Sequence, residues 1–153
     1  MFYENKNDSK LYKLDRSTGE ITKLSDIYSQ FNKIIMNSDG TKAIFGCKRI
    51  SNDYAALVFY DAETSKNSVR EISSAPNKLY AYEMSENGSI AFLWSSTLYY
   101  LEYGEAGFVE VGSTIANPSS VNSIGLLEKQ KIIVLSTGAV YAQQKAYSWA
   151  SEN

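Results

Sequence analysis

The chain of 153 residues is 44% hydrophobic and 21% charged, and its formal net charge is −2. This balance excludes a disordered chain and predicts one globular domain that is large enough to bury a core. Because both charge signs are scattered along the sequence, no basic stripe can follow a phosphate backbone, and we expect no nucleic-acid partner.

Histidine is absent from the sequence, which removes the commonest general base, the imidazole metal ligand and the histidine-dependent catalytic triads. We therefore expect no catalytic residue, no metal site and no cofactor. The single cysteine, Cys47, cannot form an internal disulfide, so the redox compartment stays open.

No apolar run approaches the roughly 20 residues of a membrane span. Residues 1–10 also lack the apolar segment of a signal peptide. A cytoplasmic location is favoured, although the mature part of an exported protein would have the same features.

The first predicted element of the chain is a hairpin in residues 11–25. Apolar and polar residues alternate in Leu11–Leu14, and Ile21–Leu24 returns after a turn at Arg16–Gly19. The preceding residues 1–10 are mostly polar and are expected to form a flexible lead-in.

Four short strands are predicted in residues 31–73, with a tight turn at Asp39-Gly40, a dipeptide typical of hairpins. The same pattern recurs in residues 77–113, where Asn87-Gly88 takes the turn position. The glycine of each pair is expected at positive φ.

A third occurrence of the pattern spans residues 122–150, but its first turn, Glu128–Gln130, contains no glycine. Its last part has two interpretations. A final hairpin would contain Val140, Tyr141, Tyr147 and Trp149. A short helix would instead use the four-residue spacing of Tyr141, Lys145 and Trp149. We favour strands because the repeat predicts them there, and we assign residues 151–153 to a tail.

The repeat has a period of about 40–50 residues and four short strands, which is typical of a propeller blade. Aligning the turns places Ala43 over Ala91 and Ile133. Strands such as Leu57–Tyr60 and Leu98–Leu101 are apolar on both faces, as expected where blades pack face to face.

Two segment types carry a resemblance to a known family. The run MNSDGTKAIFG in residues 36–46 resembles a hairpin of TolB-like and prolyl-oligopeptidase-type β-propellers. The runs LYKLDRSTGEITKLS in residues 11–25 and LVFYDAETSKNSVREIS in residues 57–73 resemble the hairpin that follows it. The resemblance implies an all-β fold, a partial β-propeller of about three to three and a half four-stranded antiparallel blades. It does not imply one function, because these propellers serve many roles.

Counting the blades leaves residues 11–25 as the outer hairpin of a blade whose inner half is missing. Known propellers close with about 4–8 blades, and an open stack exposes an apolar face. We therefore expect completion by self-association, by a partner protein or by a longer parent chain. In the first case, residues 11–25 of one copy would complete the last blade of another, and residues 139–153 would leave that blade.

Acidic residues recur at the start of equivalent turns, at Asp15, Asp61 and Glu102. A carboxylate there accepts backbone N–H groups of the turn. We favour this role over acid–base catalysis because one acid per blade does not converge with the next.

The best candidate for contact with a ligand or partner is loop 48–54, which contains Arg49, Asp53 and Tyr54 and mixes both charges with an aromatic ring. Tyr28 is expected on the same face. Trp94 stands where the first full blade has Gly46, and it could project toward that face. The alternatives are a solvated loop and a tryptophan packed between blades.

These observations predict a non-catalytic interaction or ligand-binding module. One alternative is the propeller portion of a larger enzyme, which would gate or position substrate for a separate catalytic domain. Another is a glycan-binding module that uses the tyrosine-rich surface.

Overall fold

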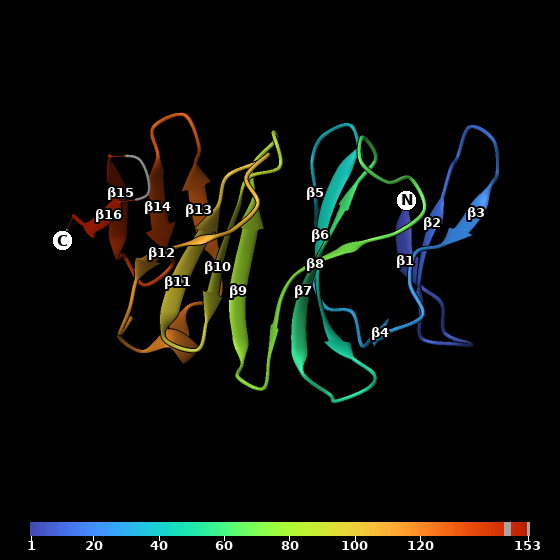
Figure 1. Ribbon diagram of the computed structural model, residues 1–153, viewed down its shortest axis with the longest axis horizontal. Coiled ribbons are helices and arrows are strands. Elements are labelled where there is room, and N and C mark those ends of the chain that lie inside the picture. Colours follow the sequence, from blue (N-terminus) through green and yellow to red (C-terminus); the bar gives the residue numbers. More distant parts are fainter. Residues whose placement is uncertain (146–147, 153) are drawn as a thin grey trace. The chain divides into compact units, whose positions relative to one another are not determined.

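The structure is a computed structural model that describes residues 1–145 and 148–152. Apart from one three-residue 3-10 turn, η1 (Pro118–Ser120), the regular elements of these residues are all β-strands. They form four antiparallel sheets, each built from consecutive strands of the chain (Figure 1). The sheets are divided between two compact units, Met1–Asn77 and Lys78–Asn153.

The first unit contains a three-stranded and a five-stranded sheet. The first sheet consists of β1 (Phe2–Glu4), β2 (Leu11–Leu14) and β3 (Ile21–Lys23). The second consists of β4 (Tyr28–Ser29), β5 (Ile34–Met36), β6 (Lys42–Arg49), β7 (Ala55–Asp61) and β8 (Arg70–Ala75). The two short strands β4 and β5 both pair with β6, so together they occupy one position of a four-stranded meander.

The prediction of a flexible lead-in at residues 1–10 is wrong, because β1 pairs with β2 in the register Phe2↔Lys13 and Glu4↔Leu11. The Phe2 ring packs edge-on against Phe45 and Tyr60, with centroid distances of 5.4 and 5.0 Å. Burial of this ring fixes the strand. The first sheet therefore contains three strands of a blade rather than an outer hairpin alone.

The core of the first unit lies between its two sheets. Leu11 and Phe45 are fully buried there. The whole cluster consists of Leu11, Leu24, Tyr28, Ala43, Phe45, Cys47, Ala56, Val58 and Tyr60. Residues of the cluster recur at every second position of β6 and β7, which is the spacing of one sheet face.

The second unit contains two four-stranded meanders. The first consists of β9 (Leu79–Met84), β10 (Ile90–Trp94), β11 (Thr97–Leu101) and β12 (Val109–Gly112). The second consists of β13 (Ile124–Leu127), β14 (Ile132–Leu135), β15 (Val140–Lys145) and β16 (Ser148–Ser151).

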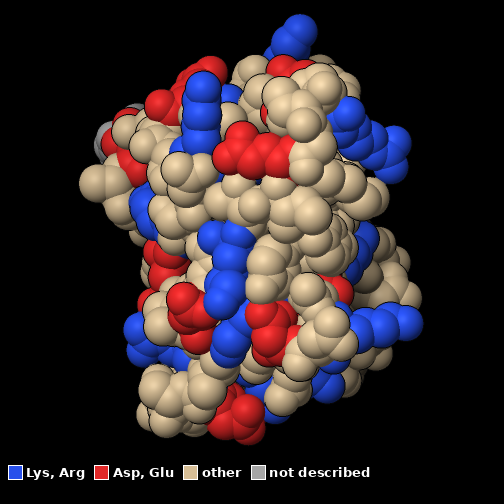
Figure 2. All heavy atoms as spheres, turned by 90° about the vertical axis from the view of Figure 1, so that its right-hand side faces the viewer, with Lys and Arg blue, Asp and Glu red and all other residues tan. Residues whose placement is uncertain are grey.

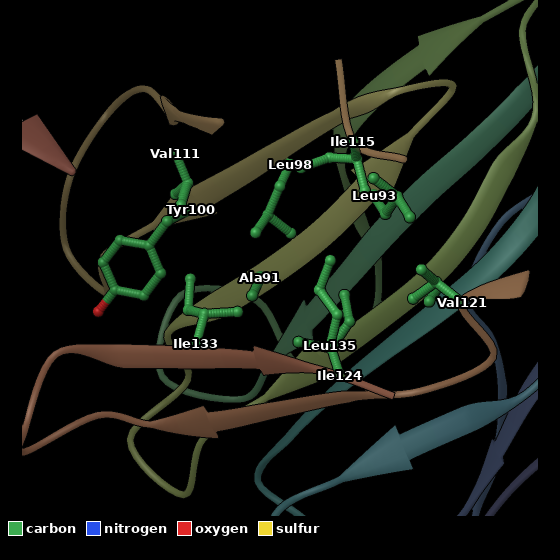
Figure 3. Packing of buried hydrophobic residues seen from close by; sticks show 11 residues of the cluster. Ala91, Leu93, Leu98, Tyr100, Val111, Ile115, Val121, Ile124, Ile133 and Leu135 are labelled. Carbon is green, nitrogen blue, oxygen red and sulfur yellow. The ribbon is translucent and has the colours of Figure 1, made fainter. Parts of the chain in front are cut away.

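These two meanders pack face to face as neighbouring propeller blades do. The first strand of one meander, β9, lies near the first strand of the other, β13, and the last strands, β12 and β16, also lie near each other. Figure 3 shows the apolar side chains of β10, β11 and β12 pointing toward those of β13 and β14. Each fully buried aliphatic side chain stabilises such a core by roughly 1.5–3 kcal/mol.

The final segment is a hairpin, as the repeat predicted, and the helical alternative is wrong. Strands β15 and β16 pair in the register Ala142↔Ala150 and Gln143↔Trp149. Tyr147, which the sequence also assigned to this hairpin, lies outside the described residues. The strand includes Ser151, and the amide of Glu152 donates to the carbonyl of Val140 at 2.9 Å, so the predicted tail is shorter than residues 151–153.

The same hairpin contradicts the exchange of residues 11–25 between copies. That exchange requires an empty outer position in the last blade, and β15 and β16 fill it. The fold is all-β and consists of propeller blades: three complete antiparallel sheets, and a first sheet of three strands.

The turns confirm the predicted glycine conformations. Gly40 and Gly88 have φ values of 72° and 96°. In the third repeat Lys131 takes this role at φ 54°, and its amide donates to the carbonyl of Glu128 at 3.2 Å. A non-glycine residue in this conformation costs roughly 1–3 kcal/mol.

The recurring acidic residues divide into two groups. Asp15 Oδ1 accepts from the amide of Ser17 at 2.9 Å, and Asp61 Oδ1 accepts from the amide of Glu63 at 3.0 Å, as predicted for turn-capping carboxylates. The hydrogen bonds from Ser17 hold the pKa of Asp15 below its usual value. Glu102 differs, because its carboxylate binds the ammonium group of Lys131.

Candidate functional site

Loop 48–54, which connects β6 to β7, is an ordered turn. The amide of Arg49 donates to the carbonyl of Tyr54, and the amide of Asp53 donates to the carbonyl of Arg49, both at 2.9 Å. Asn52 Oδ1 accepts from the amide of Tyr54 at 3.0 Å, and Asp53 has a φ of 60°. A loop fixed by its own hydrogen bonds loses little conformational entropy when it binds a partner.

The side chain of Arg49 is held by a network that sequence analysis did not predict. Glu71 lies on β8, which pairs with β7. Its Oε1 lies 2.9 Å from Arg49 Nε in an ion pair and accepts a hydrogen bond from the hydroxyl of Tyr28, also at 2.9 Å. Its Oε2 accepts from Ser74 Oγ at 3.2 Å. A carboxylate that is itself held by two hydrogen bonds gives its ion-pair partner, the guanidinium group of Arg49, a fixed anchor.

Tyr28 is buried, so its ring does not lie on the exposed face beside loop 48–54, where the sequence analysis expected it. Its strand β4 pairs with the end of β6, in the register Tyr28↔Arg49, and this pairing places the ring in the core of the first unit. Burial, together with the hydrogen bond to Glu71, raises the pKa of the Tyr28 phenol well above its ordinary value. Tyr28 therefore acts on the surface only through Glu71, which positions Arg49.

Next to Arg49 the surface is hollowed and apolar. A hollow of about 400 Å³ is lined by Asp26, Ile27, Arg49, Ile50 and Ser51. Ile27 and Ile50 are 55% and 51% exposed, and the amide of Ile50 donates to the carbonyl of Ile27 at 2.9 Å. We call these five residues and Tyr54 the Arg49 patch.

The two isoleucines were missed by the sequence analysis. Each is an apolar residue inside a polar loop, in the runs SDIYS and KRISN, and this isolation is the signal that could have found them. Nothing in the sequence spacing joins the two loops. They meet only because β4 pairs with β6.

Asp53 and Tyr54 differ in what they offer a partner. Asp53 is exposed, but its carboxylate lies 3.4 Å from Lys48 Nζ in an exposed ion pair. Such pairs contribute little to stability, so both charges remain free to exchange partners. Tyr54 is 37% exposed, and its ring is accessible beside the loop.

Trp94, at the end of β10 in the second unit, is buried and does not form an exposed contact. Its ring lies edge-on to Phe92 at a centroid distance of 6.4 Å. The structure thus favours the alternative that Trp94 is a packing residue.

A second hollow, of about 560 Å³, lies in the second unit. Its polar lining includes Thr114, Asn117, Ser120, Thr137 and Ser151. Thr114 and Asn117 have φ values of 53° and 49°, a conformation that is uncommon for residues other than glycine.

Within residues 1–145 and 148–152, no cluster of three or more Cys, Asp or Glu side chains is placed to hold a metal ion. Among the same residues, no helix is long and apolar enough to cross a membrane. On the side that Figure 2 shows, Lys and Arg side chains alternate with Asp and Glu side chains, and no single charge sign dominates.

Comparison with known proteins supports the fold and does not assign a function. No protein-family model and no curated protein sequence matches this chain. Two crystal structures of the extracellular domain of BT4673 from B. thetaiotaomicron are similar to it, with TM-scores of 0.50 and 0.51 and 12% sequence identity. The match covers 88% of this chain and 20% or 19% of those chains, so the chain spans about one fifth of their length.

The Dos1 propeller is also similar, with a TM-score of 0.42 and 10% identity over 88% of this chain and 46% of that one. The comparisons give no support to the expected cytoplasmic location, because the BT4673 structures are of an extracellular domain. The strand order of the sheets and the blade packing in the second unit establish that this chain consists of β-propeller blades.

Proposed function

We propose that this chain is a non-catalytic interaction module, built from TolB-like propeller repeats, which binds a protein partner through the Arg49 patch. The observation that supports this most directly is the pair of exposed isoleucines beside an arginine that is already held in place. Arginine, tyrosine and apolar anchors in a preformed hollow are the usual energetic centres of protein interfaces.

The chemistry of the patch defines the partner. Glu71 approaches Arg49 at Nε, and a guanidinium group carries four N–H donors besides the one on Nε. A carboxylate of the partner fits these donors. An apolar side chain next to that carboxylate would fill the hollow between Ile27 and Ile50. We therefore expect a partner segment in which an acidic residue adjoins an apolar one.

The test is selection of binding peptides from a random displayed library with the purified chain. Selected peptides should be enriched in apolar residues next to Asp or Glu. Their affinity should fall at least tenfold for Ile50→Ser and for Arg49→Gln, with melting temperatures close to that of the unmodified chain. Met36→Ser is the matched control, because Met36 is an equally exposed apolar residue outside the patch. Peptides that bind all three variants equally would contradict the proposal.

A glycan-binding module is a second candidate, and the hydroxyl and amide groups around the hollow near Asn117 support it. A glycan array probed with the chain would detect it, and Asn117→Ala should then abolish the signal. The propeller portion of a larger enzyme would use the Arg49 patch to position a substrate. In that case, binding to the patch should track the substrates of the catalytic domain rather than a peptide sequence class.

A further inference from the structure

The polar hollow of about 560 Å³ in the second unit, which we call the Asn117 hollow, is built from two loops and two strand ends. Residues 113–123 connect β12 to β13, and residues 136–139 connect β14 to β15. Both loops contribute to the lining, together with Tyr141 of β15 and Ser151 of β16, which face each other across the two paired strands. All of the lining residues therefore belong to one compact unit.

Hydrogen bonds hold both loops in place. The amide of Ile115 donates to the carbonyl of Ser96, and the amide of Gly138 donates to the carbonyl of Leu135, both at 2.8 Å. The ring of Tyr141 lies directly against Gly112 of β12, where there is no room for a Cβ atom. The hollow is thus formed before a ligand enters it, which lowers the entropic cost of binding.

The backbone of the first loop is strained where it lines the hollow. Thr114 and Asn117 have φ values of 53° and 49°, and for a β-branched residue such as Thr114 this conformation is a genuine outlier. Strained residues of this kind gather at ligand-binding loops. Two of them lie within four residues and line the same hollow, which points to a binding role for it.

Several polar side chains of the hollow are not used by the protein itself. In the part of the chain that the structure describes, no side-chain hydrogen bond is made by Asn117, Ser120, Thr137 or Tyr141. An amide and three hydroxyl groups can each donate and accept. Burial raises the pKa of the Tyr141 phenol, so this hydroxyl keeps its proton and can act as a donor.

The rest of the lining defines the class of ligand. Ile115, Ala116 and Ala139 add apolar contacts, and none of the lining residues carries a charge. A charged ligand would lose water here without gaining an opposite charge. A neutral sugar ring fits, because it combines several hydroxyl groups with apolar C–H faces. The volume lies within the roughly 300–1,000 Å³ of small-molecule sites.

We propose that the Asn117 hollow binds a neutral saccharide, whose C–H face lies on the apolar residues and whose hydroxyl groups bond to the free side chains of Asn117, Ser120, Thr137 and Tyr141. This inference rests on the glycan-binding candidate described above and adds the ligand class and the residues that hold the ligand. It is independent of the Arg49 patch.

The test is saturation-transfer NMR on the full chain with the methyl glycosides of glucose, galactose, mannose and N-acetylglucosamine. Each is added up to about 10 mM, which detects millimolar affinities. The methyl glycosides of glucuronic acid and glucosamine serve as charged sugars of the same ring size. At least one neutral glycoside should bind, and the two charged sugars should bind about tenfold more weakly or not at all.

Two variants remove a hydrogen-bonding group with little change to the fold. Asn117→Gly deletes the amide and keeps a residue that tolerates positive φ, and Tyr141→Phe deletes only a hydroxyl. Each should weaken binding of the neutral glycoside about tenfold, at an unchanged melting temperature. Asn122→Ala is the matched control, because Asn122 is an exposed asparagine of the same loop outside the lining, and it should bind like the unmodified chain.

Three outcomes would overturn the proposal: no binding of any neutral glycoside, tighter binding of a charged sugar, or binding that survives both Asn117→Gly and Tyr141→Phe. A glycan array distinguishes this failure from that of the glycan-binding candidate. If the chain binds the array and Asn117→Gly leaves that signal unchanged, the candidate stands and only its placement in the Asn117 hollow is wrong. If the chain binds neither the array nor the glycosides, both are wrong.

Discussion

Substituting Gly112 by alanine tests the packing of the two blades in the second unit. Gly112 lies in β12, and a Cβ atom built at this position would lie 2.7 Å from Tyr141 Cε1 and 3.4 Å from both Cδ1 and Cζ of the same ring. Real Cβ atoms do not approach so closely, so the ring must move. Tyr141 is half-buried against the blade core, and its burial raises the pKa of its phenol. Overpacking at such a site typically costs about 1–3 kcal/mol.

Gly107→Ala is the matched control, because a Cβ at Gly107 meets no atom within 4 Å. We expect it to leave the free energy of unfolding unchanged or to raise it by about 0.4–1 kcal/mol, since alanine restricts the unfolded chain. Combining Gly112→Ala with Tyr141→Val should remove the clash. The double mutant should therefore be more stable than the sum of the two single changes predicts, by about 1–2 kcal/mol.

The assay is urea unfolding followed by tryptophan fluorescence and circular dichroism. With a slope of about 2 kcal/mol per molar urea, a loss of about 2 kcal/mol lowers the midpoint by about 1 M. If the two units unfold separately, only the transition of the second unit should move. Equal midpoints for Gly112→Ala and Gly107→Ala would show that β12 does not approach β15, and this would refute the proposed packing of the two blades.

Three further predictions concern the first unit and the turns. Glu71→Gln should lower the free energy of unfolding by about 1–3 kcal/mol in denaturant titrations, because it removes the charge that pairs with Arg49 and weakens the acceptor for the Tyr28 hydroxyl. Ser74→Ala removes only the longer hydrogen bond to Glu71 and should lower the free energy of unfolding by less. Burial raises the pKa of Cys47 to about 12, so its thiol should react with DTNB at pH 8 only on unfolding. The thiol of the unfolded chain ionises near pH 9, so the free energy of unfolding should fall between about pH 9 and 12. Cys47→Ala should remove this pH dependence. Gly88→Val should cost about 1–3 kcal/mol through strain at positive φ, and an unchanged melting temperature would contradict this turn conformation.

The repeat in the sequence predicted the strands well, because turn residues and alternation are local signals. It did not predict the register between repeats. Aligning the turns placed Ala43 over Ala91, yet Ala43 faces the preceding sheet and Ala91 faces the following one. The reason is that the turn after Met36 contains one residue more than the turn after Met84, and a slip of one residue exchanges the two faces of a strand.

Strand β1 was missed for a different reason. Its two apolar residues, Phe2 and Tyr3, are adjacent and are followed by the polar residues 4–10, so the segment has no recognisable period. What stabilises it is the distant pair of rings, Phe45 and Tyr60, onto which Phe2 packs. Tertiary contacts of this kind determine whether a short strand forms, and the β-propensity of its residues does not reveal them.

The candidate site shows the same division between local and tertiary information. Loop 48–54 could be found from composition, and the structure places Arg49 and Tyr54 at the surface there. Tyr28 and Trp94 were assigned to that surface from their position along the strands, but position does not tell which way a side chain points. Both rings are buried.

In the proposed interface, the buried tyrosine contributes to specificity. An arginine on an ordinary loop samples many conformations, and ordering it on binding costs about 0.5–1.5 kcal/mol. Here Tyr28 and Ser74 hold the carboxylate of Glu71, and Glu71 holds Arg49. The arginine is therefore already ordered in the free protein, and binding loses less conformational entropy. A fixed guanidinium group beside two exposed isoleucines favours one partner geometry over others, which is the property expected of an interaction surface rather than of a solvated loop.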